Sequence, residues 1–170
     1  MKKTFSMLIL TLFLLVSAGF VFAAEMAKEG SDTGKTGFTG TSQVLAQGKE
    51  YLQINYDARG VPMVENEASP FYMSSVQCIG SIKGIKGEFK EYGLCTYTRP
   101  DGDQIYGSYE GTGKFGEGVK GSMTIVGGTG KCANITGSFE WARTNLKGPA
   151  KGISASISKY SYNWKIPSGE

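Results

Sequence analysis

Along most of the chain, short runs of apolar and β-branched residues alternate with turns that contain glycine. From Gln43 onward these runs are rich in Tyr, Ile, Val, Thr and Phe, and no window keeps a helical period with capping residues. Regular strand spacing with glycine turns is typical of an antiparallel sandwich or barrel. The pattern predicts strands near residues 44–57, 72–84, 88–98, 104–112, 119–126, 134–143 and 152–165, and the first is long enough to bend into two.

The 25 glycines change this picture in one respect. A glycine inside a strand weakens it unless a bulge, a corner or a close backbone contact requires it. Small closed barrels contain such places, because their strands must bend. The sequence therefore predicts an all-β fold: a single closed or nearly closed antiparallel β-barrel of seven to eight strands, with a flexible N-terminus.

The first residues have the pattern of a secretory signal peptide. Lys2 and Lys3 precede an apolar run over 7–16, and Val21-Phe22-Ala23 places small or aliphatic residues where signal peptidase cleaves. The alternative is a membrane anchor, but the run is short for a span of roughly 20 residues. We therefore predict a signal peptide over 1–23, and no stable membrane insertion once it is removed.

The predicted export determines the rest of the domain plan. Residues 24–42 are mostly Gly, Thr, Ser and Lys, so they predict a flexible linker before a barrel domain over 43–168. No cysteine lies near the cleavage site, so the protein is not expected to be a lipoprotein. The predicted location is periplasmic or secreted.

Charge and composition exclude several function classes. The chain has 18 Lys and Arg against 15 Asp and Glu; loss of Lys2 and Lys3 leaves 16 against 15. This near balance argues against nucleic-acid binding, which normally shows a clustered basic face. Histidine is absent, which excludes Ser-His-Asp and Cys-His catalysis and His-containing zinc sites. We expect no metal and no cofactor.

Two of the three cysteines can be placed opposite each other by register. If the strands near 72–84 and 88–98 form a hairpin around Lys86-Gly87, then Ile85 faces Glu88 and Cys78 faces Cys95. That pair falls on a non-hydrogen-bonded position, where side chains approach most closely. An exported chain keeps disulfides, so we favour a Cys78–Cys95 bridge over two buried free thiols. The intact mass should then differ between reduced and unreduced protein.

The stretch GSMTIVGGTGKCANITG resembles the start of a phosphate-binding loop. Against the template G-x-x-x-x-G-K-[ST], however, Ile125 replaces the first glycine and Cys132 replaces the Ser or Thr that reaches magnesium. No helix follows to hold a phosphate, and none follows the G-x-G-x-x-G match over 111–116. We expect no nucleotide, and assign Gly127, Gly128 and Gly130 to a turn between strands.

Aromatic residues on the predicted strands suggest a ligand site. A small barrel can enclose one ligand between aromatic walls and a few polar groups. Ordinary filling of the core is the alternative interpretation. Glu91 shares a strand face with Cys95, and Glu140 neighbours Trp141, so either carboxylate could act as an acid or base if it points inward. The candidate ligand-binding residues are Glu91, Tyr97, Tyr106, Glu140 and Trp141.

Several turns together resemble a known family. The Cys78/Cys95 hairpin with Gly80 and Gly93, an Asp101-Gly-Asp103 turn, and the Gly-Gly-Thr-Gly-Lys turn over 127–131 are similar to dirigent proteins and allene oxide cyclase-like barrels. The similarity is greatest to small exported bacterial members of unknown function. It covers roughly residues 72–142, and Cys132 stands where the resembling proteins place an aromatic residue.

The resemblance implies an eight-stranded barrel, often a homo-oligomer, with an apolar cavity and no metal or organic cofactor. Its plant members steer radical coupling or cyclise a fatty-acid epoxide, but their catalytic residues do not map onto this chain. Three hypotheses follow. The protein binds a small apolar or aromatic ligand without catalysis, acts as a cofactor-free isomerase, cyclase or stereo-directing protein, or is an envelope interaction protein whose barrel is filled.

Overall fold

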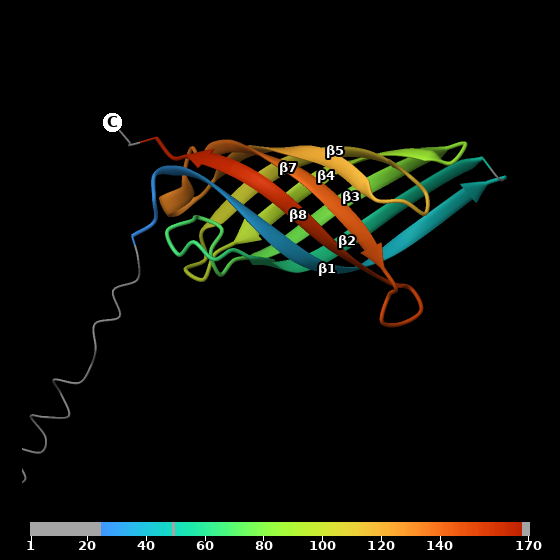
Figure 1. The fold of residues 1–170 in the computed structure, drawn as a ribbon, viewed down its shortest axis with the longest axis horizontal. Coiled ribbons are helices and arrows are strands. Elements are labelled where there is room, and N and C mark those ends of the chain that lie inside the picture. Colours follow the sequence, from blue (N-terminus) through green and yellow to red (C-terminus); the bar gives the residue numbers. More distant parts are fainter. Residues whose placement is uncertain (1–24, 49, 168–170) are drawn as a thin grey trace, which may run out of the picture.

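The computed structural model describes residues 25–48 and 50–167, which form a closed antiparallel barrel (Figure 1). The predicted signal peptide over 1–23 lies outside the described residues, so its assignment stays a prediction. No helix in the described part of the chain is long and apolar enough to span a membrane. The strands are β1 (Glu29–Gln47), β2 (Tyr51–Met63), β3 (Ser75–Ile85), β4 (Glu88–Thr98), β5 (Gln104–Lys114), β6 (Val119–Gly128), β7 (Thr136–Leu146) and β8 (Ile153–Lys165).

Each strand pairs with its neighbours in the sequence, and β1 closes the barrel by pairing with β8 from Glu29↔Lys165 to Thr41↔Ile153. The predicted all-β barrel is thus confirmed, with eight strands. The long predicted run 44–57 contains the end of β1 and just over half of β2, with the turn residues Gly48 and Glu50 between the two strands. We call the end with the connections β1–β2, β3–β4, β5–β6 and β7–β8 the hairpin end.

The prediction of a flexible linker over 24–42 is wrong for residues 29–42, which belong to β1. The composition suggested disorder because this strand has few apolar side chains. Its inward glycines instead make room for rings of β8: a Cβ at Gly30 would lie 2.6 Å from Trp164, and one at Gly34 would lie 2.6 Å from Tyr160. The strand is stabilised by aromatic rings that its neighbour supplies.

A loop over 64–74 closes the end opposite the hairpin end. Its Phe71 is buried and packs edge-to-face against Tyr97, Phe139 and Tyr162, with ring centroids 5.0 to 5.2 Å apart. The Ser69 hydroxyl is hydrogen-bonded to that of Tyr162 at 2.8 Å, which ties the loop to β8. We call this the plugged end.

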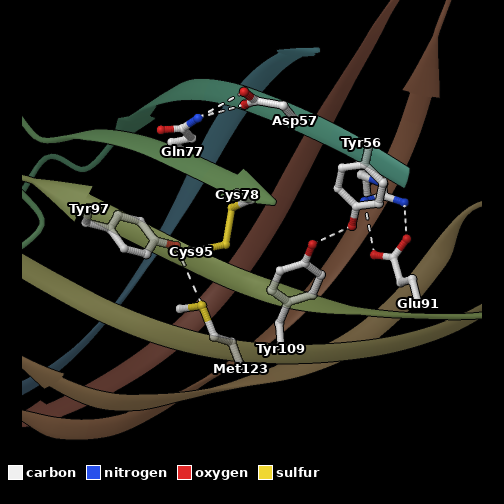
Figure 2. Close-up of a disulfide and its surroundings, with 10 residues drawn as sticks. Tyr56, Asp57, Gln77, Cys78, Glu91, Cys95, Tyr97, Tyr109 and Met123 are labelled. Atoms are coloured by element: carbon white, nitrogen blue, oxygen red, sulfur yellow. Dashed lines mark hydrogen bonds and ion pairs between the residues drawn. A yellow bond between two sulfur atoms is a disulfide. The ribbon is translucent and has the colours of Figure 1, made fainter. Parts of the chain in front are cut away.

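The β3–β4 hairpin has the predicted register, with Ile85 opposite Glu88 and Cys78 opposite Cys95. The turn residues Lys86 and Gly87 both have positive φ, at 53° and 86°, as a tight two-residue turn requires. The Cys78–Cys95 disulfide is present, which confirms the prediction (Figure 2). A disulfide indicates a non-reducing compartment.

Removing this disulfide should lower the free energy of unfolding by about 3 kcal/mol, because the bridge restrains a loop comparable to the one for which chain entropy gives that value. The change is Cys78→Ala with Cys95→Ala, and the measurement is urea denaturation followed by circular dichroism. The buried Cys132 is the matched control: Cys132→Ala leaves the bridge in place. Equal stability of the double variant and the parent protein would contradict the prediction.

The Gly-Gly-Thr-Gly-Lys turn docks on the Asp-Gly-Asp turn. Lys131 donates its backbone N–H to Asp103 at 2.8 Å and its ammonium to Asp101 at 2.9 Å, and the Lys131 bond holds the pKa of Asp101 below its usual range. The turn assignment is wrong for Gly127 and Gly128, which are the last residues of β6 and pair with β5 beside a register shift. Gly130, with a φ of 51°, does lie in the turn. A 3₁₀ turn over Gly130–Cys132 follows, so the phosphate-loop alternative has no helix to use.

Candidate functional site

The barrel interior contains a partly open cavity of about 80 Å³. Most of its wall is aromatic or apolar, because β4, β5 and β7 turn alternate residues inward. The Cys78–Cys95 disulfide forms part of the wall. The other lining residues include Tyr56, Ala58, Glu91, Tyr97, Tyr109, Met123, Phe139, Trp141, Arg143 and Tyr160.

Two tyrosines meet inside the barrel from opposite strands. The phenolic oxygens of Tyr56 on β2 and Tyr109 on β5 are 2.5 Å apart (Figure 2). Glycine makes this meeting possible: a Cβ at Gly80 or Gly93 would overlap the Tyr109 hydroxyl. Since one hydroxyl donates its hydrogen to the other, the second hydroxyl keeps a hydrogen that it can donate elsewhere.

Beside the tyrosines, a buried ion pair joins β4 to β7. Arg143 donates to both carboxylate oxygens of Glu91, at 3.0 and 2.6 Å. The Glu91 side chain is fully buried, whereas that of Arg143 is 17% exposed. The guanidinium carbon also lies 5.8 Å from the centroid of the Trp141 ring. Each oxygen of the carboxylate therefore accepts one N–H group of Arg143, and the guanidinium has further N–H groups beyond these two.

The phenols of this cluster are held in their protonated form. Burial raises the pKa of Tyr109 and of Tyr56, and the negative charge of Glu91 raises both further. Burial also raises the pKa of Tyr97, whose hydroxyl points at the sulfur of Met123 at 4.0 Å. The pKa of Arg143 is raised by Glu91, against the effect of burial. The cluster thus combines neutral phenol donors with a closed ion pair.

Of the predicted site residues, the structure brings Glu91, Tyr97 and Trp141 to the cavity wall. The prediction is wrong for Tyr106 and Glu140, which do not line the cavity. Inward residues of β5 are odd-numbered, so Tyr106 points outward and donates to Gln104 at 2.9 Å. Glu140 alternates with the inward Phe139 and Trp141, and is exposed.

The sequence analysis did not assign Tyr56, Tyr109 or Arg143 to the site. A usable signal existed for Tyr109, since β4–β5 register places it opposite Gly93, on the same face as the cysteine pair. Arg143 gave no such signal, because it lies 52 residues from Glu91 on a strand that is not adjacent. Within the described residues, no group of three or more Cys, Asp or Glu side chains could hold a metal ion.

Comparison with known proteins supports the fold. One solved structure that matches is described as that of the pterocarpan synthase dirigent protein GePTS1, at 14% sequence identity and a TM-score of 0.52. The match covers 82% of this chain and 93% of that chain. No family model matches the chain, and no curated protein does. The chain therefore has a dirigent-like β-barrel fold, whereas the similarity to allene oxide cyclase-like and bacterial members stays a prediction.

Proposed function

We propose that the protein is an exported β-barrel that binds one small aromatic molecule in its interior, without chemical change. The observation that carries this proposal is the aromatic cavity beside a phenol pair with a hydrogen to donate. Binding pockets are typically apolar with a few placed polar groups, and this interior has that composition. The cavity also favours ligand binding over a filled barrel that acts only through its surface.

The size of the cavity restricts the ligand. At about 80 Å³ it is well below the roughly 300 Å³ at which pockets for drug-sized ligands begin, and about half of the roughly 150 Å³ of an engineered cavity that binds benzene. A single ring is therefore the upper limit, and part of that ring would lie in the open part of the cavity. Fused ring systems would require the wall to move.

The polar cluster specifies where the ligand carries an oxygen. The free hydrogen of the Tyr56–Tyr109 pair needs an acceptor, such as a carbonyl, ether or hydroxyl oxygen. The remaining Arg143 N–H groups would favour a partial negative charge at the same place. We therefore expect a single-ring molecule with an oxygen acceptor on one side and an apolar face toward Phe139 and Trp141.

A cofactor-free isomerase or cyclase is the second candidate, and Glu91 enclosed beside two tyrosines is the observation that favours it. The neighbour described as a synthase supports keeping this alternative. Against it, Arg143 occupies both oxygens of Glu91, which leaves that carboxylate poorly placed to take a proton from a ligand. The protonated phenols can polarise a carbonyl, but the cluster has no free base beside them.

Removing the Tyr109 hydroxyl should weaken binding of a single-ring ligand by about fivefold, because one net hydrogen bond is worth about 1 kcal/mol. The change is Tyr109→Phe, and the measurement is the dissociation constant by isothermal titration. Tyr92→Phe is the matched control, since Tyr92 is exposed on the outer face of β4. A loss of affinity in both variants, or in neither, would contradict the assigned role.

The experiment that tests the proposed function is native mass spectrometry of the protein purified from its own host's periplasm or medium. We expect a bound molecule with the mass of a single-ring compound, released when the protein unfolds. Its recovery chemically unchanged after incubation supports binding without catalysis. Conversion to an isomer would favour the second candidate, and only ligand-free protein, together with failure of a panel of single-ring probes, would contradict both.

A further inference from the structure

The four connections at the hairpin end combine exposed apolar side chains with lysines. We define the hairpin rim as the described residues among 44–53, 83–90, 112–120 and 144–155, which form the β1–β2, β3–β4, β5–β6 and β7–β8 connections (Figure 1). Each connection exposes at least one large apolar side chain, between 39% and 61% exposed. These residues are Val44, Leu45, Tyr51, Ile85, Phe115, Leu146 and Ile153.

Lysines surround these apolar side chains. The hairpin rim contains seven lysines and three glutamates, Glu50, Glu88 and Glu117. Lys83 and Lys90 are directly opposite each other on β3 and β4, an arrangement that is unfavourable on an isolated sheet. None of the ion pairs among the described residues involves a rim lysine. The seven are Lys83, Lys86, Lys90, Lys114, Lys120, Lys147 and Lys151.

The plugged end has the opposite charge. Its described residues 25–32, 61–75, 99–104, 126–135 and 165–167 contain seven Asp and Glu against four Lys and Arg. The two ends of the barrel therefore differ in sign although the whole chain is close to neutral. A near-neutral chain that separates its charges along one axis experiences a torque in an external field, which orients it.

We propose that the hairpin rim docks on the surface of a membrane that contains anionic lipid. Lysines near such a surface are attracted by its negative potential, and exposed apolar residues gain by entering the interface between headgroups and acyl chains. The acidic plugged end is repelled, so the barrel stands with its hairpin end on the bilayer. This contact is peripheral and reversible, and it requires no strand to cross the membrane.

The apolar residues of the rim favour a lipid surface over a soluble anionic polymer. A polymer of phosphate or sulfate groups would be held by lysines alone, and the large exposed Leu45 and Leu146 would contribute nothing. At a bilayer these side chains leave water, which adds to the attraction of the lysines. The two partners therefore predict different effects of changing the apolar residues.

Sedimentation with lipid vesicles tests the proposal, using the exported form of the protein with its N-terminus determined by intact mass. We expect binding to vesicles of phosphatidylcholine with phosphatidylglycerol, little binding to phosphatidylcholine alone, and release at high salt. Replacing Lys86, Lys114, Lys147 and Lys151 by Gln should lower partitioning by about tenfold or more, since each lysine that lies near the surface contributes roughly fivefold. The charge-matched control replaces Lys28, Lys35, Lys159 and Lys165 by Gln.

Substitution of the apolar rim residues distinguishes a lipid surface from a soluble anionic polymer as the binding partner. Leu45→Ser with Leu146→Ser should lower vesicle binding about tenfold and leave any binding to soluble polyphosphate unchanged. Val61→Ser with Met73→Ser, which changes exposed side chains away from the rim, should have no effect. Equal losses in the control variants, equal binding to neutral vesicles, no binding to anionic vesicles, or vesicle binding that ignores Leu45 and Leu146 would each overturn the proposal.

Discussion

Replacing Glu91 by leucine should lower the free energy of unfolding by about 3 kcal/mol, because the change leaves a charged guanidinium in the barrel without its partner. Glu91 is the acceptor for two N–H groups of Arg143, and the arginine side chain is only 17% exposed. The remaining exposure lets some water reach the guanidinium, which keeps the expected loss at the lower end for buried pairs. Urea denaturation followed by near-ultraviolet circular dichroism measures it.

The double variant Glu91→Leu with Arg143→Leu is the control. Removing both charges also removes the cost of leaving one unpaired, so the double variant should be more stable than the single one. If the loss of stability in the double variant equals the sum of the losses in Glu91→Leu and Arg143→Leu alone, the ion pair does not act as a unit. Unchanged stability of Glu91→Leu would mean that water solvates the unpaired Arg143 guanidinium as well as Glu91 does, which would contradict the prediction.

The Phe71→Ala change should lower the free energy of unfolding by about 4 kcal/mol, the range for a large buried ring. Phe71 is 1% exposed and joins the 64–74 loop to three aromatic rings of the barrel wall. Its removal leaves a hole at the plugged end, between rings that three different strands supply. Thermal and urea unfolding of the variant provide the measurement.

Met73→Ala, two residues along the same loop, is the matched control because Met73 is 67% exposed. We expect it to change stability by less than about 0.5 kcal/mol. If both variants lose the same stability, the loop contributes through its backbone and not through the Phe71 plug. If neither does, the loop is not part of the cooperative core.

Local pairing was predictable from the sequence, and particular residues show why. A two-residue turn at Lys86-Gly87 determines the register of the hairpin, so it predicted the Cys78–Cys95 bridge and placed Glu91 on the same strand face as that bridge. The same alternation, carried across to β5, would have placed Tyr106 outside and Tyr109 inside. That step needed the β4–β5 register, which a five-residue connection leaves open.

Contacts across the barrel could not be predicted in this way. Tyr56 and Tyr109 are 53 residues apart and approach through space left by glycines on the strands between them. The composition of residues 24–42 predicts a linker, because β1 has few apolar side chains of its own. The rings that pack against its glycines belong to Trp164 and Tyr160, at the other end of the chain. A closed barrel joins distant segments, so the composition of one segment does not reveal what it packs against.

The central claim, a binding cavity for one aromatic ring, is tested most directly by nuclear magnetic resonance titration with phenol. We predict saturable shifts confined to cavity residues such as Tyr109, Phe139 and Trp141. Ala58→Leu, which fills the cavity, should abolish them, and Ala142→Leu, which adds the same atoms on the exposed face of β7, should not. Shifts scattered over the outer surface, shifts that persist in Ala58→Leu, or no shifts with phenol would contradict the account.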